Sequence, residues 1–285
     1  MTAPGIIDSH HHLWDPRQAS YPWMDGDVFT PIRRSFDEAE LAEIARAHGV
    51  RHTVLIQTRH EVDETEGLLG LAAESDLIAG VVGWVDLTSA DVEAELRRLR
   101  SRGGGSKLVG VRHIVHDEED GEWLLRADVS RGLAAVGRLD LTFDLLVRTR
   151  ELPAALATVR RHPDVRFVID HLAKPPIASG NLSAWKRALE PFGSERNAYC
   201  KFSGLVTEAS WDRWRVEDLR PVVDFAMAVF GADRLLFGSD WPVCLLAATY
   251  DEVLEAAQDC VADRPEEDRT GVFGGNACKA YKLAI

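Results

Sequence analysis

Ile6-Ile7-Asp8-Ser9-His10-His11-His12-Leu13-Trp14-Asp15-Pro16 is the stretch around which this 285-residue chain is organised. Side chains on a β-strand alternate between its two faces, so the pattern predicts that Asp8, His10 and His12 share one face. Two imidazoles that leave one strand end in the same direction are half of a metal or catalytic site. A purification tag explains the triplet less well, because it lies between Ile-Ile and Leu-Trp and not in a polar linker.

Two later stretches have the same construction, an apolar strand that runs into polar residues. They are Val168-Ile169-Asp170-His171 and Phe237-Gly238-Ser239-Asp240-Trp241-Pro242. If the three strands are parallel neighbours in one sheet, their carboxyl ends meet at one edge. The sequence therefore predicts that His10, His12, His171 and Asp240 converge.

Composition narrows the class of protein. A hydrophobic content of 46% and a charged content of 28% are ordinary for a globular protein. The net charge of −13 argues against nucleic acid and anionic membrane surfaces as partners. The chain contains no apolar run near the roughly 20 residues of a membrane span, and Met1 to Gly5 lacks the features of an export signal. We expect a cytoplasmic protein with a small-molecule ligand; the sequence leaves monomer and homo-oligomer open.

Strand-like and helix-like segments alternate along the whole chain. Expected strands follow the first one at residues 52–58, 78–85, 108–114, 141–147, 166–170, 199–202 and 234–237. Expected helices cover 35–48, 63–75, 90–100, 123–136, 151–161, 182–189, 216–230, 249–262 and 276–283. The first of these begins with a capping-box pattern, Ser35-Phe36-Asp37-Glu38.

Eight strand–helix units without a composition break predict a (β/α)₈ TIM barrel, a single domain over residues 1–285. A doubly wound open sheet is the alternative. The first strand–helix turn lacks the G-x-G-x-x-G pattern that the dinucleotide-binding version of that sheet would need.

Polar groups gather where the expected strands end, which is where catalytic groups of such barrels lie. These residues are His10, His12, Gln57, Arg59, Trp84, Asp86, Arg112, His113, Asp144, Asp170, His171, Lys201, Ser203, Asp240 and Trp241. Nearly every strand thus ends in a group able to ligate, donate or accept, which favours an enzyme.

The ordered set resembles the amidohydrolase superfamily, in its amidohydrolase-2 branch, over essentially the whole chain. Asp8-x-His10-x-His12, His171, Asp240 and the closing Gly275-Asn276-Ala277 match its pattern. Further segments are similar to its sugar-lactonase group, which contains L-fuconolactonase: Tyr21-Pro22-Trp23, Val82-Gly83-Trp84, Val111-Arg112-His113, Asp170-His171-x-x-Lys174-Pro175, Lys201-x-Ser203-Gly204-Leu205-Val206-Thr207-Glu208 and Phe237 to Leu245.

This resemblance implies a hydrolase that opens a sugar-derived, L-fuconolactone-like aldonolactone to the aldonic acid. A lactone carbonyl needs an activated water and a group that stabilises the developing oxyanion. We expect Asp240 to be the general base, and His171 and His113 to donate to the carbonyl oxygen. The residues expected to bind substrate are Trp23, Gln57, Arg59, Trp84, Arg112, Asp144, Lys174 and Trp241.

Several of these residues have a structural alternative. Trp84 and Trp241 could pack in the core, and Asp144 could form an ion pair with Arg112. Asp8 could support a ligating histidine from behind. Surface or helix-capping roles are favoured for His52, His60, His116 and His162.

The expected metal content has two alternatives. Binuclear members of the superfamily carry a carboxylated lysine at the end of strand four, where this chain has Arg112-His113 and where Lys107 lies at the opposite end. A bridged two-metal centre is therefore not expected. Either one divalent ion, zinc ahead of manganese, is held by His10, His12, Asp240 and His171, or the site works without metal.

Two rival functions remain open at this stage. A mononuclear zinc-dependent decarboxylase of an aromatic or dienoic acid would use the same ligands, and Arg59, Arg112 and Lys174 could bind its anionic substrate. The other rival is a non-catalytic sugar-binding barrel, which would have no need of Asp240 as a base.

Overall fold

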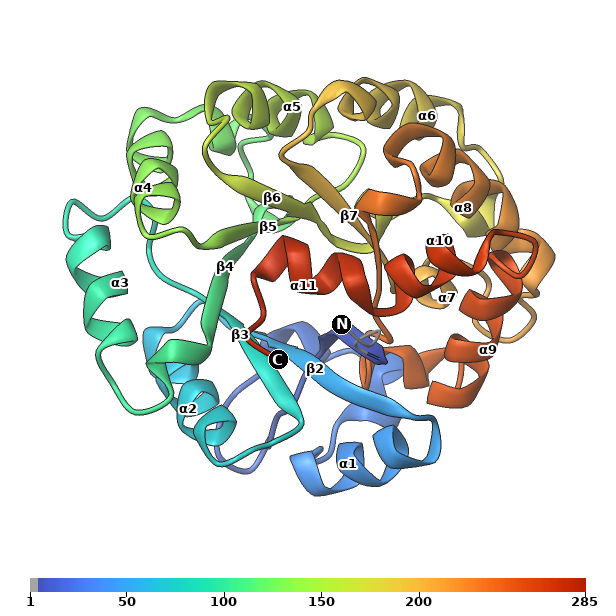
Figure 1. Cartoon of the computed structure of the whole chain (residues 1–285), viewed down its shortest axis with the longest axis horizontal. Helices are drawn as coiled ribbons and strands as arrows, with labels where there is room; N and C mark the ends of the chain where they lie inside the picture. Colours follow the sequence, from blue (N-terminus) through green and yellow to red (C-terminus); the bar gives the residue numbers. More distant parts are fainter. Residues whose placement is uncertain (1–4) are drawn as a thin grey trace.

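The computed structural model describes residues 5–285. The expectation about an export signal falls mostly on residues 1–4, which lie outside the described residues. Eight strands pair in parallel in the order in which they occur in the chain (Figure 1). They are β1 (Ile6–His11), β2 (Val50–Ile56), β3 (Ile78–Gly83), β4 (Leu108–Ile114), β5 (Thr142–Leu146), β6 (Arg166–Ile169), β7 (Ala198–Phe202) and β8 (Leu235–Phe237).

Helices surround this sheet, as Figure 1 shows, so the fold is the predicted (β/α)₈ TIM barrel. They are α1 (Glu38–Ala47), α2 (Val62–Ala73), α3 (Val92–Arg100), α4 (Ala127–Arg138), α5 (Leu152–Arg161), α6 (Ser183–Leu189), α7 (Leu205–Glu208), α8 (Val216–Phe230), α9 (Tyr250–Cys260), α10 (Glu266–Thr270) and α11 (Asn276–Tyr281). Within residues 5–285, none of the helices is both long and apolar enough to span a bilayer.

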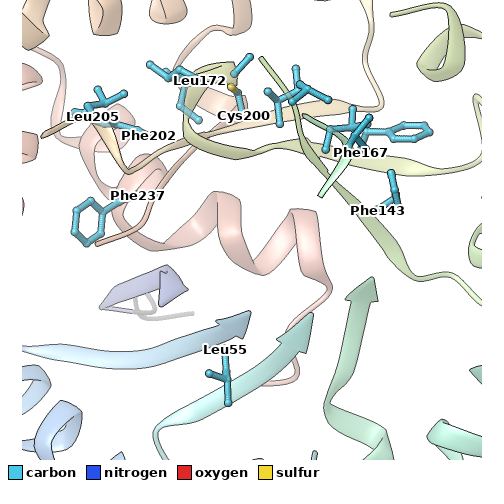
Figure 2. Close-up of a cluster of buried hydrophobic side chains, with 14 of the residues drawn as sticks. Leu55, Phe143, Phe167, Leu172, Cys200, Phe202, Leu205 and Phe237 are labelled. Atoms are coloured by element: carbon cyan, nitrogen blue, oxygen red, sulfur yellow. The ribbon is translucent and has the colours of Figure 1, made fainter. Parts of the chain in front are cut away.

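The apolar core has two parts. The larger part lies between strands and helices and includes Phe143, Phe167 and Phe237, which Figure 2 shows on β5, β6 and β8. The smaller part fills one end of the barrel, where side chains of α11 such as Tyr281 pack against inward-facing Val54 and Ile56. Helix α11 crosses the middle of the ring in Figure 1, and it closes the barrel at the end opposite the site described below.

Backbone and side-chain hydrogen bonds together hold the seam between β8 and β1, where the His12 amide donates to the Trp241 carbonyl (2.7 Å) and the Asp240 amide to the His10 carbonyl (2.8 Å). Ser9 Oγ donates to the Phe237 carbonyl (2.6 Å), and the Asp8 carboxylate accepts from the amide and hydroxyl of Ser239 (2.9 and 2.6 Å) and from Tyr250 Oη (3.1 Å). The pairing register shifts between Asp8 and His11, so strict alternation fails here. The prediction that Asp8 shares a face with His10 is therefore wrong. Its carboxylate accepts from Ser239, just after β8, from Tyr250 of α9 and from the His10 backbone amide (3.1 Å), and from no imidazole among the described residues.

Most element boundaries match the expected ones within two residues, with three informative exceptions. Helix α1 is capped by Asp37, whose side chain accepts from the Glu40 amide, and not by Ser35. A 3₁₀ turn at Trp123–Leu125 precedes α4, which begins only at Ala127. Helices α7 and α10 and a π-helical turn at Gly271–Gly275 were not predicted. All are too short to produce an amphipathic repeat.

Candidate active site

One carboxylate oxygen, Asp240 Oδ1, lies at the centre of three imidazoles. Its distances to the Nε2 atoms are 3.5 Å for His12, 3.7 Å for His10 and 3.9 Å for His171. The His10 and His12 Nε2 atoms are 3.2 Å apart. All four side chains are buried, at the carboxyl ends of β1, β6 and β8. The predicted convergence of these four residues is thus present.

Hydrogen-bond contacts at Nδ1, the ring nitrogen that faces away from Asp240, orient the imidazoles of His12 and His171. His12 Nδ1 lies 2.9 Å from the Ile56 carbonyl, which can only accept, so this contact makes Nδ1 the donor and leaves Nε2 free of hydrogen. His171 Nδ1 lies 2.9 Å from Ser203 Oγ. Gly204, at φ +62°, lets the chain pass against this ring: a Cβ there would come within 2.5 Å of His171 Nδ1 and 3.1 Å of Asp240 Oδ2.

Backbone conformations of the left-handed region recur at the site. Asp240 has a φ of 58°, and the four consecutive residues from His171 to Lys174 have φ between 51° and 58°. None of the five is glycine, so each conformation is unfavourable by itself. Such conformations persist where the surrounding structure imposes them, and they cluster at functional sites.

A network of buried charges lies directly beneath the histidines. Lys201 Nζ contacts Asp144 Oδ2 (2.6 Å), Asp170 Oδ1 (2.9 Å) and His10 Nδ1 (3.1 Å), and the side chains of Lys201 and both aspartates have no exposed surface. Arg112 Nη1 lies 3.0 Å from Asp170 Oδ2 and 3.3 Å from His10 Nε2. The alternative that Asp144 and Arg112 pair with each other is therefore wrong, because Asp144 pairs with Lys201 and Arg112 with Asp170.

Burial favours the neutral forms of His10 and His171 beside the Asp240 carboxylate. Burial, reinforced by the charge of Lys201, holds the pKa of His10 well below its ordinary value. Burial lowers the pKa of His171 to about 4. Burial alone would raise the pKa of Asp240, but the His171 imidazole and the contact with His12 outweigh it and lower this pKa. Near neutral pH the carboxylate can accept a proton, and His10 and His171 have lone pairs to ligate or accept.

The centre opens into a cavity of about 170 Å³. Six residues predicted for the site line it: His12, Trp23, Arg112, His171, Lys174 and Asp240. Lys174 Nζ is paired with Glu208 Oε1 at 2.7 Å, and Arg112 is paired with Asp170 as above. His10 lies behind this lining with no exposed surface.

Five predicted substrate-binding residues do not line the cavity: Trp84 and Arg59, which are described below, and Gln57, Asp144 and Trp241. Gln57 and Asp144 have no exposed surface inside the barrel, where Gln57 Nε2 donates to the Arg112 carbonyl (3.2 Å). Trp241 is fully buried and packs edge-to-face on Phe36, with ring centroids 5.2 Å apart. The core-packing alternative therefore describes the surroundings of Trp241.

His113 and Trp84 lie beside the cavity in a stack of four rings. His60 stacks on Trp84 and on His113, and His113 stacks on Trp123 at 4.1 Å. Trp84 Nε1 donates to His113 Nδ1 (3.2 Å), while His113 Nε2 lies 2.7 Å from Glu118 Oε1. Both ring nitrogens of His113 are thus engaged.

Arg59 lies in an adjoining cleft of about 390 Å³, which shares Trp23 and Thr58 with the main cavity. Its Nη1 contacts Glu61 Oε2 at 2.6 Å.

The sequence reasoning missed several residues of the cavity wall. His116, expected at the surface, lines it together with Asp117, and so do Thr58 and Arg148. Each follows a strand within three residues of its end: Thr58 follows β2, His116 and Asp117 follow β4, and Arg148 follows β5. Counting every polar residue from the last position of each strand to three positions beyond it would have found them.

The donor set fits a divalent metal ion. Tetrahedral zinc, with bonds of about 2.0–2.1 Å to nitrogen and oxygen, needs ligand atoms about 3.3 Å apart. His10 Nε2, His12 Nε2 and Asp240 Oδ1 are 3.2, 3.5 and 3.7 Å apart. These three residues form a cluster that could hold a metal ion. The hydrogen bond from His12 Nδ1 to the Ile56 carbonyl is of the kind that usually orients a metal-ligating imidazole.

Comparisons with known proteins identify relatives over nearly the whole chain. The family model described as amidohydrolase matches residues 7–283. An L-fucono-1,5-lactonase from Burkholderia multivorans is 38% identical, over 97% of this chain and 96% of its own length. A crystal structure of an amidohydrolase from Burkholderia multivorans with bound zinc has a TM-score of 0.92 and 37% identity, covering 98% of this chain and 99% of that chain.

A 2,6-dihydroxybenzoate decarboxylase is a more distant structural neighbour. It covers 99% of both chains with a TM-score of 0.67 but is only 18% identical. That likeness shows the fold alone.

Proposed function

The chain belongs to the amidohydrolase family, and on this premise we propose that it is a lactonase that opens a sugar-derived, L-fuconolactone-like aldonolactone to the aldonic acid. The 38% identity to an L-fucono-1,5-lactonase, over nearly the full length of both chains, supports the substrate class. The enzyme is accordingly a hydrolase that acts on a carboxylic ester bond.

The observation that carries the proposal is the position of Asp240. Its Oδ1 lies within 3.9 Å of the Nε2 atoms of three imidazoles at the wall of the cavity, and its pKa lies below the ordinary value. A carboxylate held ionised beside polar groups that can stabilise an oxyanion is the arrangement that ester hydrolysis requires.

In the proposed reaction a water molecule attacks the lactone carbonyl carbon through its oxygen. Asp240 accepts a proton from this water as the new bond forms. The carbonyl oxygen takes up the negative charge and is stabilised by donors of the cavity wall. When the carbonyl re-forms, the bond to the ring oxygen breaks, and Asp240 returns the proton to that oxygen as it leaves as a hydroxyl. The product is the open-chain hydroxy acid.

His171 can act in two ways, depending on which ring nitrogen carries its hydrogen. If Ser203 Oγ donates to Nδ1, the hydrogen is on Nε2, which can donate to the carbonyl oxygen. If Nδ1 donates to Ser203, Nε2 is free to ligate.

A metal ion would be held by His10, His12 and Asp240, with zinc favoured by this donor set and by the zinc-bound relative. When bound, such an ion polarises a carbonyl and lowers the pKa of water.

Substrate contacts come from the rest of the cavity wall. Trp23 offers an apolar ring face for the sugar, and its Nε1 has no hydrogen-bond partner among the described residues. Arg112 and Lys174 offer donors to the sugar hydroxyls. Arg59, in the adjoining cleft, can reach only a substituent that extends beyond the main cavity.

The proposal is tested by proton release from a panel of L-fucono-, L-galactono-, D-arabinono- and L-rhamnonolactones, with the enzyme as purified, after chelation, and after zinc is restored. We expect turnover of at least one lactone, loss of activity on chelation, and its recovery with zinc. Activity that survives chelation would contradict the metal assignment alone. Absence of turnover on every lactone, together with release of carbon dioxide from an aromatic acid, would overturn the lactonase proposal.

A further inference from the structure

We infer that Trp185 is a positioning residue for the reaction, acting from outside the cavity by holding the left-handed turn His171–Lys174. The kinetic part of this inference rests on the proposed function. Trp185 belongs to α6, is fully buried, and does not line the cavity.

The turn matters because it supplies two residues of one cavity wall. His171 and Lys174 both line the cavity, and the Lys174 amide donates to the His171 carbonyl at 2.8 Å, which closes the turn. In a right-handed turn of the same length, the Cα–Cβ bonds would project on the opposite side of the chain path. The handedness of the turn therefore decides whether both side chains reach the cavity.

The sequence of the turn disfavours this handedness. Residues 171–174 have φ of 53°, 51°, 58° and 51°, yet none is glycine, the residue that adopts such angles freely. Pro175 follows, and a proline disfavours a helical conformation at the residue before it. Contacts from other parts of the chain must therefore impose the conformation.

The indole of Trp185 supplies such a contact. Its Nε1 donates to the carbonyl of Leu172, in the middle of the turn, at 2.7 Å. Leu172 and Ala173 have no exposed surface, so water cannot take the place of the indole. On its other side the indole packs on Phe225 of α8, with ring centroids 5.3 Å apart, which fixes its position. Loss of the N–H would leave a buried carbonyl without this donor while the ring could still pack.

The test compares Trp185→Phe, Ala173→Gly and the double variant in the full-length protein. Phenylalanine keeps an aromatic ring against Phe225 and removes the donor. Glycine removes the steric penalty at the position with the largest φ in the turn. The matched control is Trp214→Phe, because Trp214 is half-buried and its Nε1 also donates to a backbone carbonyl, that of Ala247, at 2.9 Å.

Two quantities are measured: native-state hydrogen exchange of the Lys174 amide, and kcat and KM for the best lactone of the panel. We expect Trp185→Phe to speed that exchange at least tenfold and to lower kcat/KM at least fivefold, and Trp214→Phe to change neither. Ala173→Gly in the Trp185→Phe background should restore at least half of each loss. Ala173→Gly alone should leave the exchange at or below the wild-type rate.

Unchanged exchange in Trp185→Phe, failure of glycine to restore either quantity, or faster exchange in Ala173→Gly alone would each overturn the inference. The exchange measurement needs no substrate. If exchange responds as expected but no lactone is hydrolysed, the stabilisation of the turn by Trp185 is supported and the proposed function fails. If lactones are hydrolysed but neither quantity responds, the inference fails and the proposed function stands.

Discussion

At the scale of single residues, the chemistry depends on Asp240 more than on any other side chain. Asp240→Asn keeps the shape of the side chain but removes its ability to take a proton, together with the negative charge of one of the three groups that would hold a metal ion. Because a positioned general base contributes about 10²–10⁴-fold to such reactions, we expect kcat to fall by about that factor. KM should change only a few-fold. Initial rates of proton release over a range of lactone concentrations measure both.

Asp117→Asn is the matched control for this variant. Asp117 also lines the cavity, but its side chain is 65% exposed and its Oδ1 contacts His116 Nδ1 at 3.0 Å. We expect its kcat to stay within a few-fold of the wild type. Equal losses in the two variants would show that negative charge in the cavity matters and that the position of Asp240 does not.

The same scale shows what could be predicted about the site. The convergence of His10, His12, His171 and Asp240 was predictable, because each follows an apolar strand directly and parallel strands end at one edge. Their chemical roles stay predictions. Asp170 carries the same sequence signal but pairs with Lys201 and Arg112 inside the barrel. A strand-end position alone does not distinguish a side chain that lines the cavity from one beneath it, because both point inward.

At the scale of elements, the seam between β8 and β1 depends on side chains in addition to backbone hydrogen bonds, which join His12 to Trp241 and Asp240 to His10. Ser239 is central there, because its hydroxyl donates to Asp8 Oδ2 (2.6 Å) and accepts from the Trp241 amide (3.0 Å). Ser239→Ala leaves these buried groups without their partner, which costs about 1–3 kcal/mol of the free energy of unfolding. Urea denaturation measures this loss.

Ser101→Ala is the control, because that hydroxyl, on an exposed side chain, donates to the Arg98 carbonyl. Exposed substitutions of this kind usually stay within about 0.5 kcal/mol. A loss for Ser239→Ala no larger than for Ser101→Ala would mean that the seam is held by backbone pairing alone.

Element order was more predictable than the details of this seam. Eight alternations of strand and helix are compatible with few topologies. The barrel could therefore be predicted from the apolar runs that mark the strands and helices. The register shift between Asp8 and His11 could not be predicted from the pattern of Ile, Asp, Ser and His. The shift depends on how β8 meets β1, which the local sequence does not specify. Likewise Asp37 and Ser35 both suit a helix cap, and tertiary contacts decide between them.

At the scale of the whole molecule, the two histidines of the ring stack make stability depend on pH. Burial lowers the pKa of both His60 and His113 to about 4, against 6.5 when unfolded. Between pH 6.5 and 4 the unfolded chain therefore binds more protons than the folded one, and stability falls as the pH is lowered through this window. Each histidine contributes a slope of up to about 1.4 kcal/mol per pH unit.

Asp144 acts in the opposite direction, because burial raises its pKa to about 6 and the folded protein then binds the extra proton. The histidine contribution is therefore measured as a difference between two proteins that share Asp144. His60→Gln removes one titrating ring while keeping a group that can accept from the Ile114 amide, as His60 Nε2 does at 3.0 Å. Urea unfolding at pH 7.5, 6.5, 5.5 and 4.5 should show a shallower loss of stability in His60→Gln, by about 1.4 kcal/mol per pH unit in the middle of the window. Parallel curves for the two proteins would mean that the pKa of His60 is the same in the folded and the unfolded chain, so that burial in the stack does not lower it.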